Sequence, residues 1–154
     1  MNALLTAAIT LAGAVILFVF NQWIQRFYFE PLHEQRKVIG EVDYLLMFWA
    51  PQFTNPSQWD ALSSEQRSYR EKGSEALRDV ACGLVATTNA VGAYWLATRS
   101  PSRAETREAA RCLIGIANSM DPETGSGRET GKENKDDAQR VRKLLRLKID
   151  PTGP

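Results

Sequence analysis

The sequence has few of the side chains from which metal centres and catalytic sites are usually built. Its 154 residues include one histidine, His33, and two cysteines, Cys82 and Cys112. These three residues are separated by 49 and 30 positions along the chain, which is not the paired spacing of a zinc site. Both cysteines neighbour apolar residues of helical segments, so we expect them to be small buried side chains. The sequence therefore predicts no metal, no cofactor and no enzyme activity.

Charged residues are absent from the first 25 positions. The segment Leu4–Ile24 is almost wholly apolar, and its 21 residues would form a helix of roughly 31 Å, about the thickness of a bilayer's hydrocarbon core. A transmembrane anchor is therefore predicted over 3–25. A cleaved signal peptide is the alternative, but no Lys or Arg precedes the apolar segment, and apolar residues continue beyond the small triplet Ala12–Ala14.

The residues after this segment indicate how it would sit in a membrane. Four aromatic residues crowd its far end, namely Trp23, Phe27, Tyr28 and Phe29, and indole and phenol rings prefer the membrane interface. Ordinary helix packing is the other explanation for them. The first basic residues, Arg26, Arg36 and Lys37, also lie after the segment. Since basic flanks stay cytoplasmic, the amino terminus is expected outside and the remainder inside.

Residues 26–120 show the apolar periodicity of an all-α domain. Inward-facing stripes at helical spacing are predicted over about 32–50, 64–86 and 102–120. Ser63 with Gln66 and Ser102 with Glu105 have the spacing of capping boxes that open the second and third helices. Pro31 is expected to kink the chain, and Thr87–Asn89 to interrupt the second helix. Together the stripes predict a small cytosolic helical bundle.

The carboxyl-terminal part divides into a polar segment and a basic one. Residues 121–139 contain a single apolar side chain, Ala138, so a flexible tether is predicted there. A basic amphipathic helix is predicted over 140–150, with the cations Arg140, Arg142, Lys143, Arg146 and Lys148. It has three interpretations: docking on the bundle through Val141, Leu144 and Leu145, contact with an anionic leaflet, or nucleic-acid binding. Nucleic acid is not expected as a partner, because the 19 basic and 18 acidic residues nearly balance.

Two short runs carry a resemblance. Phe29–Val42, with Glu-Pro-x-x-Glu-Gln-Arg after the apolar segment, and Leu113–Ser119, with Leu-Ile-Gly-x-x-Asn-Ser, resemble short bacterial single-span membrane proteins of no assigned role. The resemblance implies an anchor followed by a helical domain, in the inner membrane of a bacterium. It implies no activity.

These observations favour a non-enzymatic interaction module, an anchored adaptor or scaffold whose partners are the bilayer and either itself or another membrane-associated protein. The alternative is a self-assembling membrane effector triggered by a cytosolic signal, by analogy with small membrane proteins of phage-defence systems. The residues expected to contact a partner or ligand are Arg36, Lys37, Tyr94, Trp95 and Arg99. An exposed apolar patch around Trp59, Tyr94 and Trp95 would favour the adaptor, and a basic cleft with Arg103 or Arg107 the effector.

Overall fold

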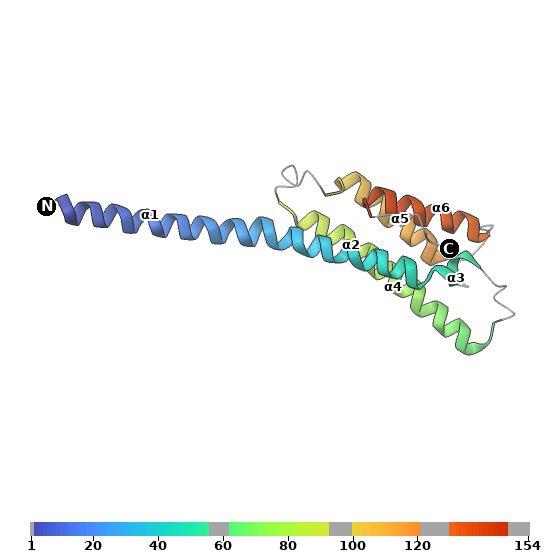
Figure 1. Cartoon of the computed structure of the whole chain (residues 1–154). Coiled ribbons are helices and arrows are strands. Elements are labelled where there is room, and N and C mark those ends of the chain that lie inside the picture. Colours follow the sequence, from blue (N-terminus) through green and yellow to red (C-terminus); the bar gives the residue numbers. More distant parts are fainter. Residues whose placement is uncertain (1, 56–61, 93–99, 121–129, 148–154) are drawn as a thin grey trace.

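The computed structural model describes residues 2–55, 62–92, 100–120 and 130–147, and every regular element in these ranges is helical. The elements are α1 (Asn2–Ile24), the π-helical turn η1 (Gln25–Phe29), α2 (Glu30–Phe48), α3 (Ala50–Thr54), α4 (Ser64–Ala90), α5 (Arg103–Met120) and α6 (Thr130–Leu144). Figure 1 shows α1 leaving the bundle as a long arm, with the amino terminus at its far end. The predicted class, an all-α protein with a long apolar amino-terminal helix followed by a bundle, is confirmed.

The long arm and the first helix of the bundle are one helix, continuous over Ala3–Phe48. The kink predicted at Pro31 does not interrupt this helix. Proline has no N–H to donate to the preceding turn, but the wider turn η1 comes just before it, and the Glu30 N–H donates to the Gln25 carbonyl. The backbone therefore changes its hydrogen-bond spacing within a π-helical turn, and α1 continues directly into α2.

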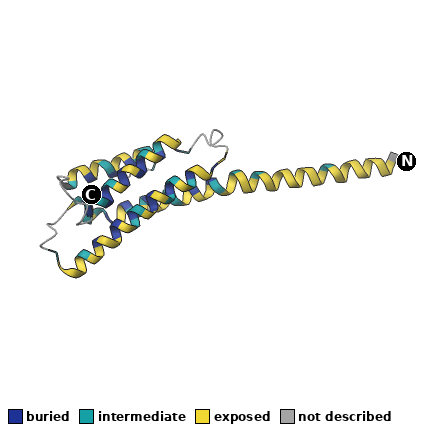
Figure 2. Cartoon of the chain, turned by 180° about the vertical axis from the view of Figure 1, so that it is seen from behind, coloured by how far each residue is buried: buried dark blue, intermediate teal, exposed yellow. Residues whose placement is uncertain are grey.

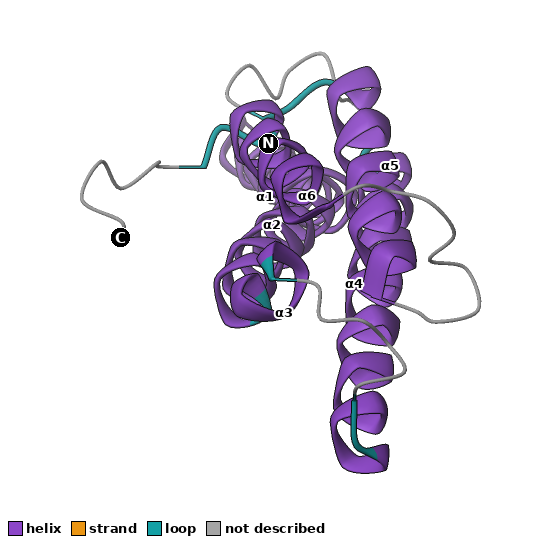
Figure 3. Ribbon diagram, turned by 90° about the vertical axis from the view of Figure 1, so that its right-hand side faces the viewer, coloured by secondary structure: helices purple, strands orange, loops and turns teal. Residues whose placement is uncertain are grey.

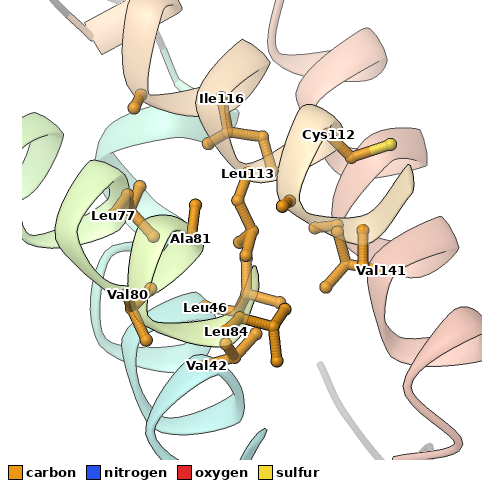
Figure 4. Close-up of a cluster of buried hydrophobic side chains, with 14 of the residues drawn as sticks. Val42, Leu46, Leu77, Val80, Ala81, Leu84, Cys112, Leu113, Ile116 and Val141 are labelled. Atoms are coloured by element: carbon orange, nitrogen blue, oxygen red, sulfur yellow. The ribbon is translucent and has the colours of Figure 1, made fainter. Parts of the chain in front are cut away.

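The bundle consists of α2, α4, α5 and α6, with the short α3 at the end farthest from α1 (Figures 1 and 3). Its core is a single cluster of side chains from these helices. Figure 4 shows them converging, with Leu113 of α5 among Leu46 of α2, Ala81 of α4 and Val141 of α6. All four of these side chains are fully buried. This cluster gives the bundle its stability, since each helix buries the apolar stripe that its sequence carries.

Both predicted capping boxes are confirmed. The Ser63 N–H donates to Gln66 Oε1 at 3.0 Å and Ser63 Oγ accepts from the Gln66 N–H at 3.3 Å. At the start of α5, the Ser102 N–H donates to Glu105 Oε2 at 2.6 Å, and the Glu105 N–H donates to Ser102 Oγ at 3.1 Å. These pairs satisfy backbone donors that have no partner within the helix, and they fix where α4 and α5 begin.

The interruption predicted at Thr87–Asn89 is wrong, because α4 continues to Ala90. The hydroxyl of Thr88 donates to the Leu84 carbonyl at 2.7 Å and that of Thr87 to the Gly83 carbonyl at 2.9 Å. Both side chains therefore bond back onto their own helix, as threonine often does inside helices. Thr88 also accepts a hydrogen bond from the buried Gln35 of α2 at 3.0 Å, which ties the last turn of α4 to the neighbouring helix.

The tether predicted over 121–139 is wrong for residues 130–139, which belong to α6; the rest of it lies outside the described residues. The helix buries Asn134, Ala138 and Val141, and Leu145, directly after its last residue, continues the same spacing. The Asn134 amide donates to the Phe53 carbonyl at 2.8 Å and anchors α6 to α3. Because Asn134 is polar, a search for apolar residues at helical spacing does not detect the face that packs on the bundle.

The basic helix predicted over 140–150 begins earlier and ends earlier, since α6 is regular only to Leu144. Arg146 adopts a left-handed backbone with φ of 57°. The Arg146 N–H donates to the Lys143 carbonyl at 3.2 Å, and the Leu147 N–H to the Arg142 carbonyl at 2.9 Å. This pair of bonds is a Schellman motif, which closes a helix. Lys148 lies outside the described residues.

Candidate functional site: an exposed aromatic face

The helix α1 is exposed along almost its whole length (Figure 2). Its large apolar side chains, for example Leu4 at 81 % and Ile16 at 68 %, contact little else in the protein. Over Ala3–Phe48 the chain contains a helix long and apolar enough to cross a membrane. A signal sequence near the amino terminus can pass the same test of length and composition, so the exposure of α1 establishes a candidate span and no more.

The aromatic residues predicted for a membrane interface lie where α1 passes into η1. Trp23, Phe27 and Phe29 are exposed and Tyr28 is half-buried. The ring centroids of Trp23 and Phe27 are 5.5 Å apart, and those of Tyr28 and Phe29 are 5.4 Å apart. The rings thus form a band around the helix at the point where its uncharged segment ends, which is the arrangement expected for interfacial residues.

A second exposed apolar surface lies at the end of the bundle remote from α1. It consists of Tyr44, Met47 and Phe48 of α2 and Tyr69 of α4, which we call the Tyr44 face. These side chains are 61 %, 65 %, 47 % and 44 % exposed, respectively. The rings form one chain, in which Tyr69 is connected to Phe48 through the buried Trp49. Centroid distances are 5.7 Å for Tyr44–Phe48, 5.0 Å for Phe48–Trp49 and 4.7 Å for Trp49–Tyr69. The buried Trp49 joins the face to the core.

The Tyr44 face arises from the sequence at the end of α2. The run Tyr44–Trp49 contains no charged residue, and its members point in two directions. Leu46 and Trp49 are buried and Leu45 is half-buried, whereas the remaining three are exposed. A helix that is apolar all round normally buries its whole circumference. From the sequence only the inward stripe was predicted. The run Tyr44–Trp49 has more apolar residues than one inward stripe can hold, and this would have indicated that some of them are exposed.

A pocket of about 520 Å³ adjoins the Tyr44 face, between α3 and the first turns of α4. Pro51, Gln52, Tyr69 and Arg70 contribute to its lining. One Arg70 guanidinium nitrogen donates to the Asn55 carbonyl at 3.4 Å, and burial lowers the pKa of this side chain. The pocket provides a polar edge beside the aromatic surface, as at the rim of a protein–protein interface.

The predicted contact residues are only partly within the described structure. Arg36 and Lys37 lie exposed on α2, and the Lys37 ammonium is 2.7 Å from the Glu34 carboxylate. The hydrogen bond and charge of Lys37 lower the pKa of Glu34. Tyr94, Trp95 and Arg99 lie outside the described residues, as does Trp59. Arg103 donates to the Val91 carbonyl at 3.2 Å, so this guanidinium contributes to closing the end of α4.

Of the three interpretations of the basic segment, the structure shows docking on the bundle. Val141 and Leu145 are buried against the core, and Leu144 is half-buried. Three of its cations pair with acidic side chains of the bundle: Arg140 with Glu108 at 2.9 Å, Arg142 with Asp43 at 3.5 Å and Arg146 with Glu105 at 3.7 Å. These acidic side chains partly neutralise the positive charge of the basic segment. Contact of Lys143 and its neighbours with a leaflet stays a prediction.

The two cysteines have different environments. Cys112 is buried, as expected, and burial raises the pKa of its thiol to about 11. The expectation for Cys82 is wrong, because this side chain is exposed on α4. It follows the buried Ala81 on the apolar stripe and so lies on the outer side of the helix. Of the two thiols, that of Cys82 is therefore the one accessible to reagents in the folded protein.

Comparison with models of protein families, with curated proteins and with solved structures finds no match to this chain. The fold and the exposed surfaces themselves define the class: an all-helical protein in which a long apolar helix runs directly into a bundle that carries an exposed aromatic face. The resemblance seen in Phe29–Val42 and Leu113–Ser119 stays a prediction.

Proposed function

We propose that this protein is a single-pass protein of a bacterial inner membrane whose cytoplasmic bundle serves as a non-enzymatic interaction module, an anchored adaptor or scaffold. The observation that carries the proposal is the continuous helix Ala3–Phe48. One end of it is an exposed apolar span and the other end bears the Tyr44 face. In this proposal a single helix, Ala3–Phe48, connects the membrane anchor to the binding surface.

The geometry of this helix separates the Tyr44 face from the bilayer. Tyr44 lies 20 residues beyond Ile24, which corresponds to about 30 Å along a helix. If the span ends near Ile24, lipids of the same membrane are out of reach of the face while the helix stands upright. A contiguous exposed apolar surface usually marks an interaction site. Its occupant is then expected to be a protein at that height.

The alternative function is a self-assembling effector that responds to a cytosolic signal. It is supported by the same continuous helix, because a rotation or shift of the bundle would be transmitted directly to the span. The exposed cations Arg36 and Lys37 lie on that helix. They are among the cations predicted to contact a partner or ligand, and the ligand proposed for them is an anionic signal. The two functions differ in what assembly does: the adaptor holds a protein partner, which can be a second copy of this chain, whereas in the effector a cytosolic signal reorganises the spans and perturbs the membrane.

The proposal predicts that assembly depends on the Tyr44 face. We expect the full-length protein, extracted from membranes in polymer nanodiscs, to have a mass larger than that of one chain. Tyr44→Asp should reduce it to one chain, because a carboxylate placed among stacked rings loses solvation without gaining a partner. The measurement is the protein mass by light scattering. The matched control is Ile114→Asp, since Ile114 is also an exposed apolar residue, at 38 %, but lies on α5 outside the face.

A single chain in the unsubstituted protein would contradict the proposal. Equal losses of assembly in Tyr44→Asp and Ile114→Asp would also contradict it, because the effect would then come from surface charge in general.

A further inference from the structure

We infer that the occupant of the Tyr44 face is a second copy of this chain, anchored in the same membrane and docked through a parallel, two-fold contact between α2 and α2 of the second copy. The inference rests on the proposed function, because it requires both copies to be held by their spans. It goes further in naming the partner and the residues at the centre of the contact.

The continuous helix places the Tyr44 face of each copy at the same distance from the membrane. Each copy holds its Tyr44 face about 30 Å from the end of its span, on a helix that runs from Ala3 to Phe48 without a break. Two copies anchored with the same orientation present this face at the same level and with the same helix direction. Confinement to one membrane also removes part of the translational and rotational cost of association.

The composition of the face suits a contact between identical surfaces. A two-fold axis brings each residue close to its own copy, so a charge at the centre would meet a like charge. Tyr44–Pro51 contains no charged residue. The nearest charge on α2, Asp43, pairs with Arg142 of α6 at 3.5 Å. Stacked aromatic rings and a flexible methionine are side chains that pack well against themselves.

The area of the face indicates that the contact depends on the membrane. With about 200 Å² for each large side chain, the exposed fractions of Tyr44, Met47, Phe48 and Tyr69 leave about 430 Å² per copy. A symmetric pair would bury about 870 Å² from these side chains, which is less than the roughly 1,200 Å² of a stable interface in solution. The face is thus large enough for copies that are concentrated by their spans and too small for copies that are free.

The test is thiol cross-linking of full-length protein in native membranes with a short bismaleimide. The probe is Met47→Cys in a Cys82→Ser background, and the control is the unsubstituted chain, whose exposed Cys82 lies on α4 outside the face. Cys112 is buried, with a thiol pKa of about 11, and stays unreactive in both. We expect a homodimer from Met47→Cys at a yield at least about tenfold above that from Cys82. Adding Tyr44→Asp should lower the yield by about tenfold, as loss of an interface anchor does.

A second probe, Phe48→Cys, keeps the test independent of the Met47 side chain and should give the same homodimer. Equal yields from Cys82 and from the probes, or no homodimer from either probe, would overturn the inference. A cross-link from Met47→Cys to a different protein would also overturn it while leaving the proposed function intact. Recovery of the unsubstituted chain in the soluble fraction would overturn the proposed function itself.

Discussion

Replacing Leu113 with alanine is expected to lower the free energy of unfolding by about 2–5 kcal/mol, the usual cost of removing a buried leucine side chain and leaving a cavity. Leu113 is fully buried in α5 and lies among core residues from α2, α4 and α6 (Figure 4). Truncation therefore removes contacts with all the helices of the bundle at once. The measurement is urea unfolding of the full-length protein in detergent, followed by circular dichroism.

The matched control is the neighbouring residue, Ile114→Ala. Ile114 is 38 % exposed, so its truncation should cost less than about 1 kcal/mol, in line with other partly exposed substitutions. A similar loss in the two variants would contradict the burial of Leu113 in the core and the exposure of Ile114.

Gly73→Ala is expected to destabilise the bundle although alanine is the better helix former. A Cβ atom at Gly73 would lie 2.7 Å from Met120 Cε and 2.8 Å from Trp49 Cε3. The methionine can move, but the indole is held between the core and the Tyr44 face. Overpacking costs about 1–3 kcal/mol, against a gain of about 0.5–1 kcal/mol in helix propensity. The difference is a net loss of about 1 kcal/mol, and of up to about 2.5 kcal/mol if the indole cannot move.

Gly83→Ala provides the control for this substitution on the same helix. Its Cβ would meet only Val38 Cγ1, at 3.9 Å, which is ordinary van der Waals contact. Here the gain in helix propensity is not opposed, so Gly83→Ala should raise stability by about 0.5–1 kcal/mol. The two variants are thus predicted to change stability in opposite directions in the same urea titration. Destabilisation by both, or by neither, would contradict the close packing of α4 against Trp49.

Much of the fold could be predicted from local sequence signals that correspond to single physical causes. The pairs Ser63/Gln66 and Ser102/Glu105 marked the starts of α4 and α5, because their side chains satisfy backbone donors in a way that depends on spacing alone. The length of the apolar segment likewise identified α1. In these cases the interaction is complete within a few residues of the chain.

The errors arose where a distant partner decides the structure. Thr87 and Thr88 suggested an end to α4, but packing against α2 continues the helix past them. The segment 130–139 looked too polar to order, yet Asn134 finds the Phe53 carbonyl of α3, 81 positions away. The Tyr44 face was missed for a different reason, since Leu45, Leu46 and Trp49 were assigned to the inward stripe and their apolar neighbours Tyr44, Met47 and Phe48 were left unassigned. Only the positions of α4 and α6 show which of them remain exposed.

The central claim, that a membrane span is continuous with an interaction bundle, is tested most directly by the state of the amino terminus in purified membranes. The measurement is the intact mass of the protein that stays in the membrane pellet after carbonate extraction. The account predicts the full chain in the pellet, with α1 retained, and the soluble fraction for a variant that lacks residues 2–24. A soluble protein whose mass lacks the α1 segment would contradict the claim. In that case α1 would be a cleaved signal, and nothing would hold the Tyr44 face at the membrane.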